Sequence, residues 1–229
     1  MIRAVVFDLD NTLVDFMRMK NEAIEAAVHA MIDAGLSYSI EDIRAAVDRI
    51  YDAEGIEYQK VFNSVLEELL GEVDYKILAS GIIAYRRSRE ATLVPYKHVY
   101  LTLHTLVRMG LKLGVVSDAP RLEAWLRLCH LNLHHTFDAV RTFEDSGERK
   151  PSPKPFQSIL TALDVQPEET IMIGDWEERD MVGARNVGMR TAFAKYGNVH
   201  GIEQSSADYV LEDISDLIDI VRSLNGDGQ

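Results

Sequence analysis

Three features are scarce in this chain of 229 residues: cysteine, basic side chains and long apolar runs. Cys129 is the only cysteine, which excludes an intrachain disulfide and is typical of a reducing compartment. No apolar run approaches the roughly 20 residues that a membrane-spanning helix needs. The first residues also lack the basic and apolar pattern of a secretory signal. We therefore expect a cytoplasmic protein that does not bind a membrane.

The shortage of basic residues bears on the partners of the protein. Lys and Arg number 24 against 37 Asp and Glu, which gives a net charge of −13. This balance argues against a nucleic-acid-binding protein, because such proteins normally present a basic face. It does not exclude an anionic substrate, since a bound divalent metal and a few local cations can reverse the charge of a pocket.

The most informative segment is the first one, where a continuous apolar run leads into Asp8 and Asp10. Such a run is typical of a strand that is buried on both faces of a parallel sheet. Ligands of open α/β folds bind at the carboxyl edge of the sheet, which is where these two acids would lie. Two carboxylates so close together repel each other, so we expect a cation between them.

The rest of the chain divides into a helical block and an alternating region. Helices are predicted over 17–34, from 40, over 57–70 and over 75–91, and Pro95 follows them. Beyond it, strands over 112–116, 137–141, 170–173, 191–194 and 209–211 alternate with helices over 98–109, 121–128, 156–163, 181–186 and 214–224. This alternation predicts an α/β core with a doubly wound parallel sheet, formed by residues 1–15 and 95–229. The inserted block, residues 16–94, is predicted to be a helical cap domain.

Polar residues suited to phosphate chemistry follow each of the main predicted strands. Asp175 follows a later strand, and carboxylates such as Asp8, Asp10 and Asp175 are ligands that Mg²⁺ prefers. A phosphoryl group also needs a hydroxyl and an ammonium group to hold its oxygens, which Ser117 and Lys150 could supply.

Four segments carry these residues in order: DLDNT, VVSD, KPSPKPF and IGDWEERD. Together they resemble the four motifs of the haloacid dehalogenase superfamily of phosphohydrolases. The helical block between the first and second motifs is similar to the cap of the phosphoglycolate phosphatase-like branch. The resemblance implies a Rossmann-like core and a Mg²⁺-dependent phosphatase that acts on a small phosphorylated metabolite, such as a sugar, triose or glycolate phosphate.

The resemblance also implies the catalytic roles. Asp8 would attack phosphorus to form an aspartyl-phosphate, and Asp10 would be the general acid and then the general base. The carboxylates of Asp8 and Asp175 and the backbone carbonyl of Asp10 would bind Mg²⁺. Lys150 would neutralise the charge of the transferred group.

Five further residues would support these groups. Ser117 would donate a hydrogen bond to the phosphoryl group, and backbone amides near Asn11 and Asp118 would cradle it. Thr12 would orient the general acid. Asp180 would pair with the catalytic lysine and fix its position.

Position 10 narrows the reaction. Dehalogenases and phosphonatases of this superfamily lack an acid two residues after the nucleophile, whereas phosphatases and phosphomutases have one. A β-phosphoglucomutase-like phosphomutase therefore remains open, and so does a signalling module that is phosphorylated on an aspartate. Two residues depart from the motifs: Trp176 and Asp118 stand where small or amide side chains are more usual.

Several of these polar residues also allow a purely structural interpretation. Ser117 could be a helix cap, and Asp180 an acid at the start of a helix. The cations of the helical block, which are Arg18, Lys20, Arg86, Arg87 and Arg89, could contact a second anionic group of the substrate or belong to solvated helix faces. The oligomeric state is open between monomer and homodimer.

Overall fold

The computed structural model describes residues 1–226, and the chain divides into two compact units. The first contains residues 1–17 and the chain from Val94 onward, and the second is Arg18–Leu93. Within the described residues, no helix is both long enough and apolar enough to cross a bilayer.

The first unit is built on one sheet of six parallel strands in the order β3-β2-β1-β4-β5-β6. The strands are β1 (Ala4–Phe7), β2 (Lys112–Val116), β3 (Ala139–Arg141), β4 (Thr170–Gly174), β5 (Arg190–Ala194) and β6 (Tyr209–Leu211). The strand order reverses at β1, which lies between β2 and β4. The structure thus confirms the predicted doubly wound α/β fold.

The register of the central strands determines where the functional loops meet. Phe7, the last residue of β1, is paired with Val115 of β2 and with Ile173 of β4. The chain therefore leaves all three strands at nearly the same level of the sheet. This edge, beside the reversal of the strand order, is where open α/β sheets bind ligands.

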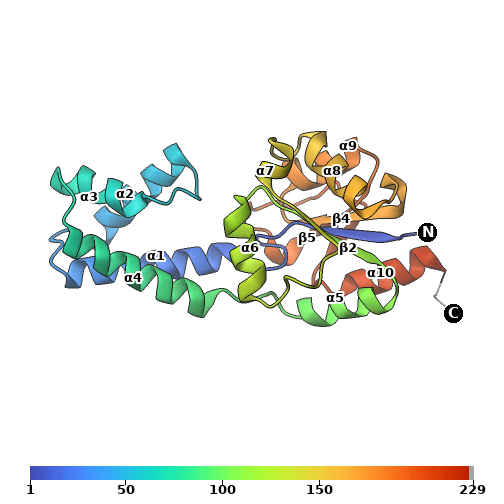
Figure 1. Ribbon diagram of the computed structural model, residues 1–229, viewed down its shortest axis with the longest axis horizontal. Coiled ribbons are helices and arrows are strands. Elements are labelled where there is room, and N and C mark those ends of the chain that lie inside the picture. Colours follow the sequence, from blue (N-terminus) through green and yellow to red (C-terminus); the bar gives the residue numbers. More distant parts are fainter. Residues whose placement is uncertain (227–229) are drawn as a thin grey trace. The chain divides into compact units, whose positions relative to one another are not determined.

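Helices cover both faces of this sheet, with α8 and α9 on one side and α5 and α10 on the other (Figure 1). The helices of this unit are α5 (Val99–Arg108), α6 (Arg121–His130), α7 (Phe143–Ser146), α8 (Pro153–Leu163), α9 (Val182–Asn186) and α10 (Asp216–Asn225). Short turns of helix occur at η1 (Pro167–Glu169), η2 (Glu177–Met181) and η3 (Lys195–Gly197). On the α8 side, Phe156 and Ile159 pack with Val6 and Met172 in one buried cluster.

The second unit is helical: it contains α2 (Ile40–Glu54), α3 (Val61–Leu70), α4 (Tyr75–Thr92) and all but the first two residues of α1 (Phe16–Asp33). Ser39 caps α2 by accepting a hydrogen bond from the amide of Asp42, and Asp74 caps α4 in the same way. Helices α1 and α4 approach closely at Gly81, where a Cβ would lie 2.7 Å from the Cγ of Met31.

Several helix boundaries differ from those expected, for local reasons. Helix α8 begins at Pro153 rather than at 156, because Ser152 caps it and a proline is tolerated where the amide has no intrahelical acceptor. Helix α3 begins at Val61 rather than at 57. A π-helical turn, η2, precedes α9, and the sequence pattern does not indicate the short helix α7.

Lys20 is neither of the two things that its sequence position allowed, which were a solvated side chain and a contact to the substrate. It is buried within the helical unit, where its Nζ donates to the carbonyl of Ile56 at 2.8 Å and lies 4.5 Å from the ring centroid of Tyr51. The aromatic face and the carbonyl compensate the charge, so the lysine has a structural partner inside its own unit. Arg18 is exposed and forms an ion pair with Glu22, one helical turn away.

Candidate active site

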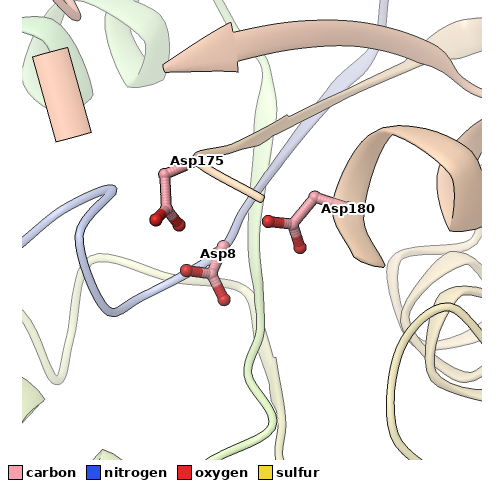
Figure 2. A group of neighbouring side chains, drawn as sticks. All are labelled: Asp8, Asp175 and Asp180. Carbon is pink, nitrogen blue, oxygen red and sulfur yellow. The ribbon is translucent and has the colours of Figure 1, made fainter. Parts of the chain in front are cut away.

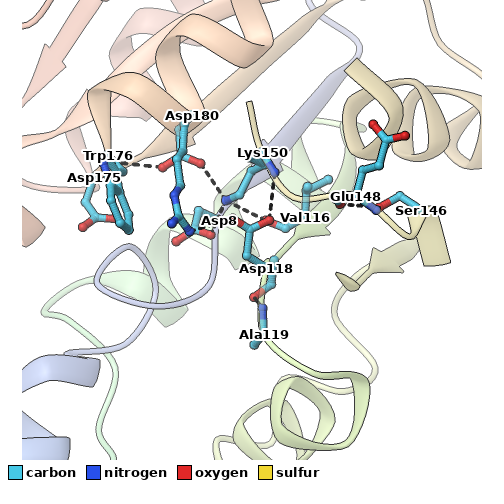
Figure 3. Close-up of polar contacts among 12 residues, drawn as sticks. Asp8, Val116, Asp118, Ala119, Ser146, Glu148, Lys150, Asp175, Trp176 and Asp180 are labelled. Atoms are coloured by element: carbon cyan, nitrogen blue, oxygen red, sulfur yellow. Dashed lines mark hydrogen bonds and ion pairs between the residues drawn. The ribbon is translucent and has the colours of Figure 1, made fainter. Parts of the chain in front are cut away.

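Lys150 lies at the centre of the polar cluster at the sheet edge. Its Nζ is 2.6 Å from Oδ1 of Asp8 and 2.6 Å from Oδ1 of Asp180, and it also donates to the carbonyl of Val116 at 3.3 Å (Figure 3). Burial by itself would lower the pKa of this lysine, but the two carboxylates outweigh burial and raise the pKa. The side chain is therefore a permanent cation that joins three segments distant in sequence.

Three buried carboxylates converge beside this lysine. Asp8, Asp175 and Asp180 each offer an oxygen within 4.8 Å of the others, and Figure 2 shows their carboxyl groups turned toward a common space. Burial is the main cause that raises the pKa of Asp8 and of Asp175, and repulsion from neighbouring carboxylates raises both further. Oδ2 of Asp175 is buried and makes no hydrogen bond within the described part of the chain. This donor set fits a hard divalent cation.

The loop after β1 is a tight turn that also starts α1. Asn11 has a left-handed backbone (φ 58°), its amide donates to the carbonyl of Val14, and its side chain accepts from the amide of Met17 at 3.0 Å. These bonds shape the turn, so the phosphate contact expected near Asn11 stays a prediction. The Thr12 hydroxyl makes no hydrogen bond to any described residue, so the expected contact from Thr12 to Asp10 is not seen in this structure.

Ser117 and Asp118 follow β2 on the other side of β1. The Ser117 hydroxyl accepts from the amide of Ala119 at 3.1 Å, which leaves its own proton for another acceptor. The Asp118 carboxylate accepts from the amide of Lys150 at 3.0 Å (Figure 3). Asp118 thereby fastens the backbone of the lysine whose ammonium group joins the carboxylates.

The two departures from the family motifs belong to one network. Arg179, on η2, donates to Asp118 at 3.1 Å and lies 3.8 Å above the ring of Trp176. Trp176 in turn packs against His200, with ring centroids 4.0 Å apart. Asp118 is thus neutralised by a cation that Trp176 orients, which explains how the site accommodates an additional acid.

A close backbone approach ties the turn after β5 to the loop after β1. A Cβ on Gly197 would lie 1.6 Å from the carbonyl oxygen of Asn11, so only glycine fits there. The neighbouring Tyr196 donates its hydroxyl to the carbonyl of Thr12 at 2.9 Å. Sequence reasoning missed this brace, because a glycine after a strand is an ordinary turn signal.

The structure therefore brings Asp8, Lys150, Asp175 and Asp180 into direct proximity, with Ser117 and Asp118 on the adjoining strand end. Asp10 does not join the carboxylate cluster, and its side chain instead lies 3.3 Å from Arg127. Arg127 and Arg179 were missed in the sequence, where both resemble ordinary helical cations. Arg179 lies inside the fourth motif, and this position in the sequence could have indicated that it is close to the site.

Comparison with known proteins identifies the family. A model of haloacid dehalogenase-like hydrolases matches residues 5–194, which include every residue of the cluster. The chain belongs to the haloacid dehalogenase-like hydrolases. The predicted family and fold are thereby confirmed, and hydrolases of this family generally use a metal ion.

Two relatives that match along the whole chain are phosphatases, and so is one protein of known structure. A glyceraldehyde 3-phosphate phosphatase of Methanocaldococcus jannaschii is 36% identical over 99% of this chain and 100% of that protein. The pyrophosphatase PpaX of Bacillus mycoides is 31% identical, over 98% and 99% of the two chains. The crystal structure of a phosphatase of this family from Thermococcus onnurineus has 25% identity and a TM-score of 0.71, covering 96% of this chain and 98% of the other. These matches confirm the predicted enzyme class, a phosphatase.

The carboxylate cluster predicts how stability depends on pH and metal. Folding raises the pKa of Asp175, so the metal-free protein should lose stability as the pH rises from about 4 through neutrality. Asp175→Asn should therefore raise the melting temperature in EDTA more at pH 8 than at pH 5, by roughly 2–4 °C for each kcal/mol of relieved repulsion. Thermal unfolding with EDTA and with Mg²⁺ measures both effects.

Mg²⁺ should raise the melting temperature of the wild-type protein and raise that of Asp175→Asn much less. Asp219→Asn, an exposed acid paired with Arg222, is the matched control and should respond as the wild type does. Equal Mg²⁺ responses in wild type and Asp175→Asn would contradict the assignment of this cluster to a metal.

The approach at Gly197 gives a second prediction. Gly197→Ala should push the turn away from the backbone of Asn11, which costs roughly 1–3 kcal/mol and reduces activity about 100-fold, because reacting groups are displaced. Lys195 is an exposed neighbour on the same turn, and Lys195→Ala should keep near wild-type stability and activity. Thermal unfolding measures the stability, and phosphate release measures the activity. A fully active Gly197→Ala variant would contradict the claim that this close backbone approach positions the loop after β1.

Proposed function

We propose that the protein hydrolyses phosphate monoesters of small metabolites through an aspartyl-phosphate on Asp8, with Mg²⁺ as cofactor. One observation carries the proposal: Asp8, at the end of the central strand, is held 2.6 Å from the buried ammonium of Lys150 and beside the carboxylate of Asp175. A cation on one side and a metal-type donor set on the other suit a nucleophile that must approach an anionic phosphoryl group.

In the first step, a carboxylate oxygen of Asp8 forms a bond to phosphorus while the bond to the ester oxygen breaks. Asp10 gives a proton to that leaving oxygen, which departs as an alcohol. In the second step, Asp10 takes a proton from water, the water oxygen bonds to phosphorus, and the acyl phosphate bond to Asp8 breaks. Inorganic phosphate leaves and Asp8 is restored.

The surrounding groups stabilise the phosphoryl group during both steps. Lys150 supplies a fixed positive charge, and Asp180 and Asp118 hold its ammonium group and its backbone amide. Ser117 already accepts a bond from the amide of Ala119, and its hydroxyl proton would be donated to a phosphoryl oxygen. These preorganised donors act in a buried site, where electrostatic interactions are strongest.

Mg²⁺ would be held by the carboxylates of Asp8 and Asp175 together with the backbone carbonyl of Asp10. Oδ2 of Asp175, which makes no hydrogen bond to a described residue, and the raised pKa values of both acids support this set of ligands. When bound, the ion supplies charge neutralisation for the nucleophile and for the phosphoryl oxygens. Asp180 acts indirectly, as the anchor of Lys150.

A triose phosphate is the substrate class that we propose first, because the relative that is 36% identical is a glyceraldehyde 3-phosphate phosphatase. The helical unit, Arg18–Leu93, would be the cap that excludes bulk water during transfer and selects the ester. We propose a cytoplasmic monomer or homodimer that requires neither nucleic acid nor a membrane, consistent with the net charge of −13.

A phosphate-release panel tests this function. Purified protein with Mg²⁺ is incubated with glyceraldehyde 3-phosphate, phosphoglycolate, hexose phosphates and pyrophosphate, and the released phosphate and the remaining sugar are quantified. The pyrophosphate sample is included because PpaX is 31% identical. We expect the highest kcat/KM with a triose phosphate. An isomerised sugar phosphate without release of phosphate would favour the phosphomutase instead.

Asp8→Asn tests the nucleophile. A carboxamide cannot form the acyl phosphate, so turnover should fall by at least about 10⁴-fold. Removal of a buried carboxylate whose pKa is raised should leave the fold intact. Turnover is measured by phosphate release and folding by circular dichroism and thermal unfolding. Near wild-type turnover in a folded variant would overturn the mechanism.

A further inference from the structure

Arg127 is a buried arginine of α6 that sequence reasoning did not connect to the site. Only 5% of its side chain is exposed, and its Nε lies 3.3 Å from Oδ1 of Asp10. Its guanidinium carbon lies 4.5 Å from the centroid of the Phe16 ring, at the start of α1. All three residues belong to the first unit.

A buried guanidinium is costly unless it is paired, so its location needs a reason. The contact with Asp10 is an ion pair and not a hydrogen bond, because Oδ1 of Asp10 makes no hydrogen bond within the described part of the chain. An aromatic face such as that of Phe16 favours one plane of the guanidinium, so the positive charge stays close to the carboxyl group. Phe16 and Arg127 together therefore place a buried positive charge on one side of Asp10. The Thr12 hydroxyl, by contrast, makes no hydrogen bond to a described residue.

The chain connectivity links this support to the phosphate-binding side of the site. Helix α6 begins at Arg121, shortly after Ser117 and Asp118 at the end of β2. Asp10 lies on the loop after β1, the adjacent strand. The arginine thus connects the loop that carries the proton donor with the element that follows the phosphoryl-binding hydroxyl.

We propose that Arg127 is a positioning residue that holds the carboxyl group of Asp10 toward the leaving oxygen. The inference rests on the proposed function, in which Asp10 protonates that oxygen. It adds that the orientation of the acid depends on Arg127 with Phe16. Loss of Arg127 should therefore slow an ester in proportion to how much its leaving group depends on protonation. An alkoxide depends on it strongly, whereas a nitrophenolate departs without a proton.

The test compares kcat/KM of Arg127→Met for glyceraldehyde 3-phosphate, or the alkyl ester hydrolysed fastest in the panel, and for p-nitrophenyl phosphate. Because kcat/KM covers only the steps up to departure of the leaving group, the later hydrolysis of the aspartyl-phosphate does not affect it. We expect a loss of about 100-fold or more for the alkyl ester and of about 3-fold or less for the aryl ester. Arg127→Lys, which keeps the charge without the planar group, should be intermediate.

Two further variants make the result decisive. Arg121→Met alters an exposed arginine of the same helix and should change neither value. Asp10→Asn should lose alkyl-ester activity selectively, and combining it with Arg127→Met should add little. If Asp10→Asn shows no selectivity for the leaving group, the proposed role of Asp10 fails, whatever Arg127 does.

If Asp10→Asn is selective but folded Arg127→Met loses activity equally for both esters, or loses none, the positioning role is wrong. Folding is monitored by thermal unfolding. Should Arg127→Met not fold, Arg127→Lys decides: a selective loss supports the role, and a uniform loss or no loss overturns it.

Discussion

The ion cluster around Lys150 is the interaction on which the rest of the site depends. One buried ammonium group bonds to Asp8, to Asp180 and to the carbonyl of Val116, and so joins the ends of β1 and β2 to the turn after β4. None of these charges would be stable alone in this environment, because a buried ion needs a partner. With Asp175 added, the acids outnumber the lysine, and this excess of negative charge leaves the site suited to a cation.

The same cluster explains the unusual residues around it. Asp118 adds another carboxylate beside the amide of Lys150, and Arg179 balances it while lying flat against Trp176. The Asp118 carboxylate alone would repel an anionic ligand, and Trp176, which also packs against His200, lies against the arginine that balances this carboxylate. Together they form a charge-balanced network between the turns after β2 and β4.

The sheet, the insertion and the acids at the sheet edge could be predicted because each leaves a local signal. Buried parallel strands are continuous apolar runs, and the polar residues that follow them mark the carboxyl edge, so Asp8 and Asp175 were identifiable from sequence. Lys150 was identifiable from the proline-rich segment KPSPKPF in a loop. Arg127 and Gly197 left no such signal. A helical arginine and a glycine after a strand are ordinary in sequence, and their importance comes from contacts with Asp10 and Asn11 more than 100 positions away. The start of α8 was misjudged because three prolines hid a helix that Ser152 caps.

The central claim, that Asp8 is the phosphoryl acceptor, is tested most directly by identifying the phosphorylated residue. The protein is mixed with Mg²⁺ and a turned-over ester, quenched in acid within one turnover, digested, and analysed by mass spectrometry. The account predicts one phosphoryl group on the peptide that contains Asp8, which appears and decays at rates compatible with turnover. Rapid turnover with no phosphorylated peptide, or with the phosphoryl group on another residue, would contradict it.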